Sequence, residues 1–223
     1  PNHKRRRPGR RRHWGLEIID HAGQGTNAWT GRAGTPMDVF SCSWYARVGR
    51  PVSLFDEAMA EIRQRLDKYA QFCDVVIEAG EFAVLRDARG RRLYAGETTE
   101  WSASFFAALA DRVYANKVRK LYEWDHATRG VLHPRGRVIQ WLERMAGGRQ
   151  LAVDVVAQSE ANGGAIACAK GASVYVLLYN HRPSPEAGQA EPVHLVVRDK
   201  RMNEGAIWTM SAWQVDQDHG VWA

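Results

Sequence analysis

The chain has 223 residues, of which 45% are hydrophobic and 25% charged, a composition typical of a globular protein with one sizeable core. No apolar run approaches the roughly 18 residues that a membrane span needs, and no apolar segment of the signal-peptide kind follows the basic start. We therefore expect no membrane partner and favour a cytoplasmic protein.

The basic charge of the chain is concentrated at its start. Residues 1–13, PNHKRRRPGRRRH, hold seven Lys or Arg residues and no acid, so the net charge of +6 falls to +6 − 7 = −1 for residues 14–223. Such a block is typical of a solvated, disordered arm, and it lacks the interleaved aromatic residues of single-strand binders. We expect a basic disordered tail, and nucleic-acid binding through it is the disfavoured alternative.

Residues 14–148 alternate between strand and helix patterns. Apolar runs predict four strands, at 15–20, 38–43, 73–82 and 118–124. Apolar residues at helical spacing predict three helices, which begin near Ser53, Trp101 and Pro134. This alternation is typical of a parallel sheet, and four such units are half of a (β/α)8 barrel of ~250 residues. We expect the C-terminal half of a barrel, with its open edges covered by a missing N-terminal half or in an oligomer.

The pattern changes near residue 149. Five strand-like runs follow without a helical pattern between them, at 151–157, 164–169, 173–180, 192–199 and 205–216. Short strands separated by turn residues predict an antiparallel β-sandwich over 149–223. The expected fold class is therefore α/β plus β, a partial (β/α)8 barrel over 14–148 followed by a β-sandwich.

Glu81 is the strongest candidate for a catalytic residue. It closes the apolar run DVVIEAGE, and catalytic residues of β/α barrels lie at the C-terminal ends of the strands. Glu78 is the alternative, because a spacing of three places the two on opposite faces of a regular strand unless Gly80 marks a bulge. We prefer Glu81, which is nearer the strand end, and expect Glu78 to pair with a basic group on a helix.

Four further residues are candidates for substrate binding. Trp44 and Tyr45 follow the second predicted strand, Trp124 ends the fourth, and His21 follows the first. The Tyr45 hydroxyl could hydrogen-bond a carboxylate and tune its pKa, and an aromatic ring such as Trp124 can stack on a sugar. The histidines and the three cysteines show no zinc-site spacing, so we expect neither a metal nor a cofactor.

Several motifs, taken in order, resemble a known family. They are DVFSCSWY, VVIEAGEFAVLRDARGRRL, TTEWSASFFAALADRVYA, LYEWD, VYVLLYNHRP and a closing WQVDQDH. Their order is similar to the C-terminal portion of glycoside hydrolase family 39, which includes β-xylosidases and α-L-iduronidases. The resemblance spans about residues 14–220 and implies a (β/α)8 barrel followed by a β-sandwich.

The resemblance also implies roles for single residues. Glu81 matches the nucleophile at the end of the seventh barrel strand, Tyr45 matches a tyrosine on the sixth, and Trp124 matches a tryptophan on the eighth. The histidine of the sixth-strand pattern is replaced by Ser43. The family's acid/base glutamate follows an asparagine, but the only Asn-Glu here, at 203–204, lies in the predicted sandwich.

The resemblance therefore predicts a retaining glycoside hydrolase, or a C-terminal fragment of one, that acts on a carbohydrate substrate and needs no cofactor. Glu81 would be its nucleophile, and the acid/base would lie outside this chain. The alternative is a non-catalytic carbohydrate-binding or scaffold protein that retains the fold.

Overall fold

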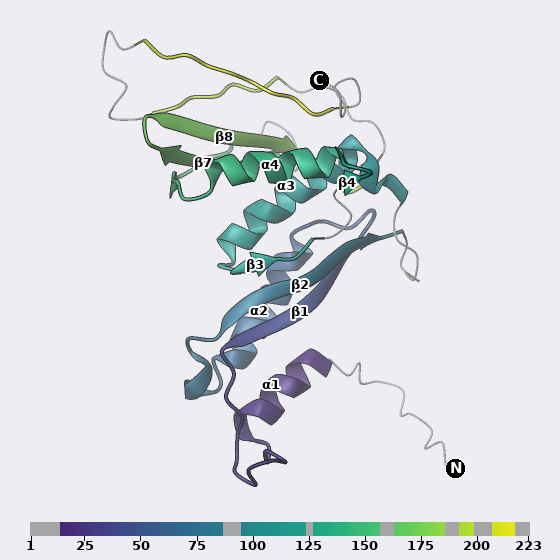
Figure 1. Ribbon diagram of the computed structural model, residues 1–223, viewed down its shortest axis with the longest axis vertical. Helices are drawn as coiled ribbons and strands as arrows, with labels where there is room; N and C mark the ends of the chain where they lie inside the picture. The colour runs from purple at the N-terminus through teal and green to yellow at the C-terminus, as the bar shows by residue number, and fades with distance from the viewer. Residues whose placement is uncertain are drawn as a thin grey trace.

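The structure is a computed structural model that describes residues 14–86, 95–123, 127–156, 163–185, 192–198 and 207–216 (Figure 1). The predicted basic tail at 1–13 and Trp124 lie outside the described residues. Within the described part, no helix combines the length and the apolar character needed to cross a membrane.

A three-stranded parallel sheet forms the centre of the N-terminal part. Its strands are β1 (Val39–Arg47), β2 (Val76–Leu85) and β3 (Lys120–Leu121), in that order across the sheet. Parallel neighbours need crossover connections, and the crossovers carry α2 (Leu54–Leu66) and α3 (Glu100–Ala115). Short 3-10 turns, Ala70–Phe72 and Ala95–Thr98, precede β2 and α3.

The two crossover helices cover one face of this sheet. Trp44 of β1 packs edge-on against Phe55 of α2, with ring centroids 5.1 Å apart, and Phe82 of β2 lies 5.8 Å from Phe106 of α3. The predicted helical stripe of α2 is confirmed, since its buried residues are Phe55, Met59, Ile62 and Leu66. One part of the hydrophobic core therefore lies between the sheet and α2 and α3.

The strand predicted at 15–20 is wrong, because these residues belong to helix α1 (Trp14–Gln24). Its buried residues, Ile19 and Ala22, are three apart and face α2. Asp20 of α1 also forms an ion pair of 3.0 Å with Arg65 of α2. The six-residue run 15–20 is too short to distinguish a helix from a strand.

The second half begins with a hairpin and a helix. β4 (Ala127–Thr128) and β5 (Val131–Leu132) pair across a turn whose central residues, Arg129 and Gly130, both have positive φ. This is the two-residue hairpin geometry with φ > 0 at both positions. α4 (Pro134–Met145) follows with proline in its first turn, as predicted, and Gly147 beyond its end has φ +76°.

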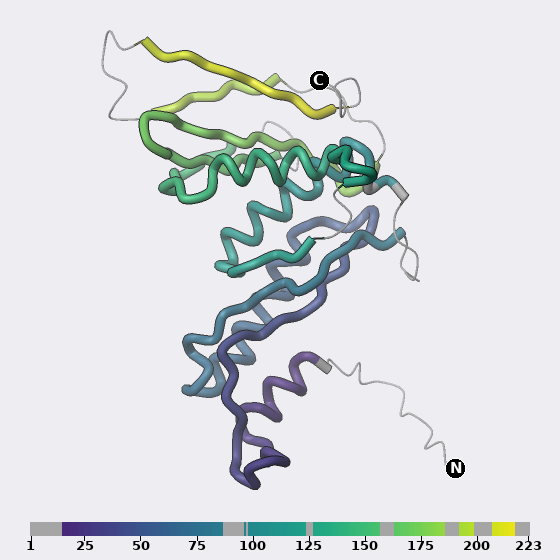
Figure 2. The backbone as a smooth tube through the Cα atoms, viewed as in Figure 1, coloured from purple at the N-terminus to yellow at the C-terminus, as the bar shows by residue number. Residues whose placement is uncertain are grey.

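Three antiparallel strands pack against α3 and α4. They are β6 (Arg149–Gln150), β7 (Gly163–Lys170) and β8 (Ser173–Asn180), in that order. The hairpin of β7 and β8 confirms two of the predicted runs. Figure 2 shows 192–198 and 207–216 as extended segments near β8, but neither is a strand.

The expected partial barrel with a β-sandwich is wrong. The described residues form one parallel sheet of three strands and two small antiparallel sheets, with no barrel. One expected barrel strand is α1, and another, β3, pairs over only two residues. The runs at 192–198 and 207–216 pair with no other strand in the described structure, and they leave large apolar side chains exposed, with Ile207 96% exposed.

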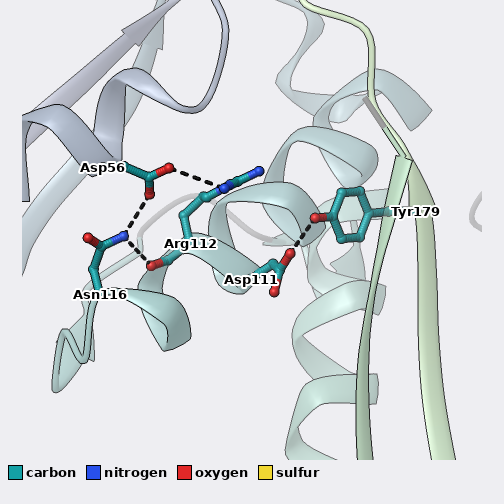
Figure 3. Close-up of polar contacts among 5 residues, drawn as sticks. All are labelled: Asp56, Asp111, Arg112, Asn116 and Tyr179. Atoms are coloured by element: carbon teal, nitrogen blue, oxygen red, sulfur yellow. Dashed lines mark hydrogen bonds and ion pairs between the residues drawn. The ribbon is translucent and has the colours of Figure 1, made fainter. Parts of the chain in front are cut away.

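Polar contacts tie the two halves together at α3 (Figure 3). Asp56 of α2 accepts hydrogen bonds from Arg112 at 3.2 Å and from Asn116 at 2.6 Å, and Asp111 accepts one from the Tyr179 hydroxyl of β8 at 2.5 Å. Burial, and then the hydrogen bond to Asp111, raise the pKa of Tyr179. The phenol therefore stays protonated and holds β8 on α3.

A second contact of this kind surrounds His181, which follows β8 and is 2% exposed. Its ring lies 5.2 Å from that of Trp101 and 5.6 Å from that of Phe105. Its Nδ1 lies 3.1 Å from Ser104 Oγ, which donates to the Trp101 carbonyl at 2.9 Å. The single hydroxyl proton of Ser104 is used in the bond to the Trp101 carbonyl. In the contact between Ser104 and His181, the His181 Nδ1–H is therefore the donor and the serine oxygen the acceptor. Burial lowers the pKa of His181 to about 4.

Candidate functional site

The face of the parallel sheet opposite α2 and α3 is polar. Side chains alternate along a strand, and in β1 the positions at Ser41, Ser43, Tyr45 and Arg47 are exposed. The intervening positions of β1 are buried or half-buried against the helices. We refer to this side of the sheet as the open face, on which the β2 residues Glu78 and Ala83 are nevertheless buried.

A β-bulge places both candidate glutamates on this open face. Ser41 lies opposite Glu78 and Ser43 lies opposite Glu81, whereas Gly80 has no partner in the ladder. The extra residue restores the phase of the alternation, so residues three apart share one face. Glu78 and Glu81 therefore lie on the open face, as their partners Ser41 and Ser43 do.

Glu81 is held by a tyrosine, as the sequence suggested. The Tyr45 hydroxyl donates a hydrogen bond of 2.7 Å to Glu81 Oε1. This hydrogen bond raises the pKa of Tyr45, and burial and the nearby charge of Glu81 act in the same direction. The phenol therefore remains a donor at neutral pH, and it fixes one carboxylate oxygen while the other stays available.

Glu78 is held by a different set of partners. Arg119 Nε donates to its Oε1 at 2.8 Å, and a terminal nitrogen of the same guanidinium lies 2.6 Å from that oxygen. The Tyr122 hydroxyl reaches Oε2 at 3.5 Å. A basic partner was predicted for Glu78, but its predicted place on a helix is wrong, because Arg119 directly precedes β3.

Trp44 and His21 do not lie beside Glu81. Trp44 points to the covered face, where it packs on Phe55. His21 lies in the last turn of α1, which packs against α2 on that same side. Trp124 lies outside the described residues. Of the three predicted binding residues that the structure describes, it brings Tyr45 alone to Glu81.

Sequence reasoning missed a buried ion pair beneath α4. Arg135 Nε lies 2.6 Å from Glu123 Oε1, and their side chains are 2% and 6% exposed. The guanidinium also lies 5.8 Å from the centre of the Phe82 ring. The ion pair joins the start of α4 to the segment after β3, and Arg135 also contacts Phe82, the residue that follows Glu81. Glu123, a glutamate two residues past β3, could have been noticed in the sequence. Nothing in the local pattern indicated that Arg135, 12 residues later, would be its partner.

No metal site accompanies these carboxylates in the part of the chain that is described, since no three metal-binding side chains gather there. The three cysteines are free thiols. The chemistry available on the open face is that of carboxylates, phenols and basic side chains.

Comparison of the chain with protein-family models, with curated proteins and with solved structures found no match. The open face with its two glutamates is therefore the basis for assigning a function.

Proposed function

We propose that the protein cleaves O-glycosides with retention of configuration, with Glu81 as the nucleophile. The observation that carries this proposal is the 2.7 Å hydrogen bond from Tyr45 to Glu81 on an exposed sheet face. Retaining glycosidases attack the anomeric carbon with a carboxylate and form a covalent glycosyl-enzyme. A donor on one oxygen leaves the other oriented for attack. The similarity of the surrounding motifs to glycoside hydrolase family 39 supports the same role.

In the proposed reaction a Glu81 oxygen bonds to the anomeric carbon as the bond from that carbon to the leaving oxygen breaks. A proton donor assists the departing alcohol, and water then hydrolyses the glycosyl ester. Glu78 is unsuited to the role of proton donor, because Arg119 occupies its carboxylate at 2.6 Å. We propose that a group outside the open face supplies this proton.

The test uses a substrate that needs no proton donor. In a 2,4-dinitrophenyl 2-deoxy-2-fluoro-glycoside the dinitrophenolate leaves without protonation by an acid when the nucleophile attacks. The fluorine slows hydrolysis of the glycosyl-enzyme intermediate. We would incubate the chain with the β-xyloside and the α-L-iduronide forms and measure the intact mass, then map the modified peptide. The expected result is one added glycosyl group on Glu81.

Two substitutions make this experiment specific. Glu81→Gln should abolish the mass increase, whereas Glu61→Gln, an exposed glutamate on α2, should leave it unchanged. A label on a different residue, or an equal label in the Glu81→Gln variant, would contradict the proposal.

A second candidate function is carbohydrate binding without hydrolysis. It is favoured by the ion pair that occupies Glu78, and by the exposed rings of Tyr45 and Tyr122, which border the two glutamates. Tyrosine rings present an apolar face and a polar tip, as sugar binding requires. Calorimetric titration with xylo-oligosaccharides distinguishes the two functions. Binding that persists in Glu81→Gln, with no covalent label in the parent chain, would support the second.

A further inference from the structure

We propose that the β-bulge at Gly80 is a positioning device that directs Glu81 toward the Tyr45 hydroxyl. The inference deepens the proposed function and rests on it for its catalytic meaning. Its geometric content, that the bulge creates the contact between Tyr45 and Glu81, can be tested independently.

The bulge is not needed to keep the apolar residues of β2 inside. Ile77 and Ala79 before it, and Phe82 and Val84 after it, are all at most 4% exposed. If Gly80 were absent, Ala79 and Glu81 would be consecutive, and the alternation of faces would continue without interruption. A regular strand would therefore bury the same four residues and leave both glutamates on the open face.

The extra residue also has a cost. A bulge leaves one residue unpaired and interrupts the ladder, and a glycine inside a strand weakens it. Bulges bend the strand, increase its twist and re-aim neighbouring side chains. Here the bend immediately precedes Glu81. The ladder partner of Tyr45 is Ala83, not Glu81, so the 2.7 Å contact joins residues that are diagonal across the two strands.

The neighbouring strand is shaped to fit the bulge. Ser41 Oγ occupies the space that a Cβ atom at position 80 would need, while Ser41 Cβ is 3.7 Å away, an ordinary contact distance. A Cβ atom at position 80 would thus collide only with the serine hydroxyl. Ser41 and Gly80 form a matched pair directly beside the two glutamates.

The main experiment compares the parent chain with a variant that lacks Gly80. The titration of Tyr45 is followed by NMR with tyrosine labelled at Cζ, and its signal is assigned by its loss in Tyr45→Phe. In the parent chain the pKa of Tyr45 should lie above its ordinary value because of the bond to Glu81. In the shortened chain it should fall to the value found in Glu81→Gln. Labelling of Glu81 by the fluoro-glycoside should slow by ~100-fold, as expected for a misplaced reacting group.

A second set of variants remains informative if the shortened chain does not fold. Gly80→Ala should lower the pKa of Tyr45 by a smaller amount, because the new methyl group displaces the Ser41 hydroxyl. Ser41→Ala alone should leave the titration unchanged. The double variant should restore it, because the hydroxyl that collides with the methyl group is gone.

The outcomes separate the two proposals. A Tyr45 titration that is unchanged both without Gly80 and in Gly80→Ala overturns the positioning role. A titration that shifts as expected, in a protein that no fluoro-glycoside labels, supports the positioning role and contradicts the glycosidase. A shift in Gly80→Ala that Ser41→Ala does not reverse would overturn the matched pair.

Discussion

His181 should make the protein lose stability as the pH falls from neutral to acidic values. The imidazole is buried between Trp101 and Phe105, and burial lowers its pKa from 6.5 to about 4. The Nδ1–H already donates to Ser104, so a second proton would be placed on Nε2, which is buried and makes no hydrogen bond in the described structure. Burial disfavours a charge on this nitrogen, so the folded chain takes up the proton only at about pH 4.

The sign and size follow from linkage. Below about pH 6.5 the unfolded chain binds a proton at this residue, whereas the folded chain does not until about pH 4. Because the unfolded state binds more protons in this window, stability falls as the pH falls through it and changes no further below it. The shift from 6.5 to about 4, at about 1.4 kcal/mol per pH unit, corresponds to a loss of roughly 3 kcal/mol.

The assay is urea denaturation of the parent chain and of His181→Phe at about pH 7, about 5.5 and about 4. Phenylalanine keeps an aromatic ring between Trp101 and Phe105 but cannot titrate. Carboxylates lower the stability of both proteins at acidic pH, so the difference between the two isolates the histidine. We expect that difference to grow in favour of the variant by about 3 kcal/mol on acidification. Parallel pH profiles for the two proteins would refute the reasoning.

Three further substitutions test the packing by urea denaturation at neutral pH. Tyr179→Phe should cost about 1.5–3 kcal/mol, because Asp111 loses a charge-assisted hydrogen bond, and no change would mean that water replaces the phenol. Arg135→Met should cost about 3–5 kcal/mol by leaving Glu123 buried without this cation, and Arg135→Met with Glu123→Leu should recover most of it. If the double variant is no better than the single one, the cost is not that of the buried charge. Phe82→Ala should cost about 3–5 kcal/mol as a core truncation, and a loss below 1 kcal/mol would place the ring at the surface.

The helices were predictable where one face is apolar over several turns. Phe55, Met59, Ile62 and Leu66 recur at helical spacing, and all four are buried in α2. The helix begins near Ser53, as expected, but the Ser53 side chain makes no capping hydrogen bond. The apolar period is strong because burial enforces it at four positions, whereas a cap depends on one side-chain torsion.

Short segments were less predictable. The apolar run at 15–20 belongs to a helix, since its buried face continues to Ala22 and packs on α2. The predicted barrel and sandwich failed for a related reason. Alternating or continuous apolar runs favour strands, but which strands pair depends on partners far along the chain.

The sequence by itself indicated that Glu81 lies on an apolar strand and that a tyrosine hydroxyl was available to it, but the predicted strand end at Glu81 is wrong, because β2 continues to Leu85. It also determined the helix of Phe55 and the hairpin of β7 and β8, because local periodicity and turn residues govern such elements. Only the tertiary structure decided that Glu78 and Glu81 share a face, since that depends on how Ser41 and Ser43 pair with β2 around Gly80. The same is true of Arg119, 41 residues from Glu78, because contacts between distant residues are set by packing and not by local spacing.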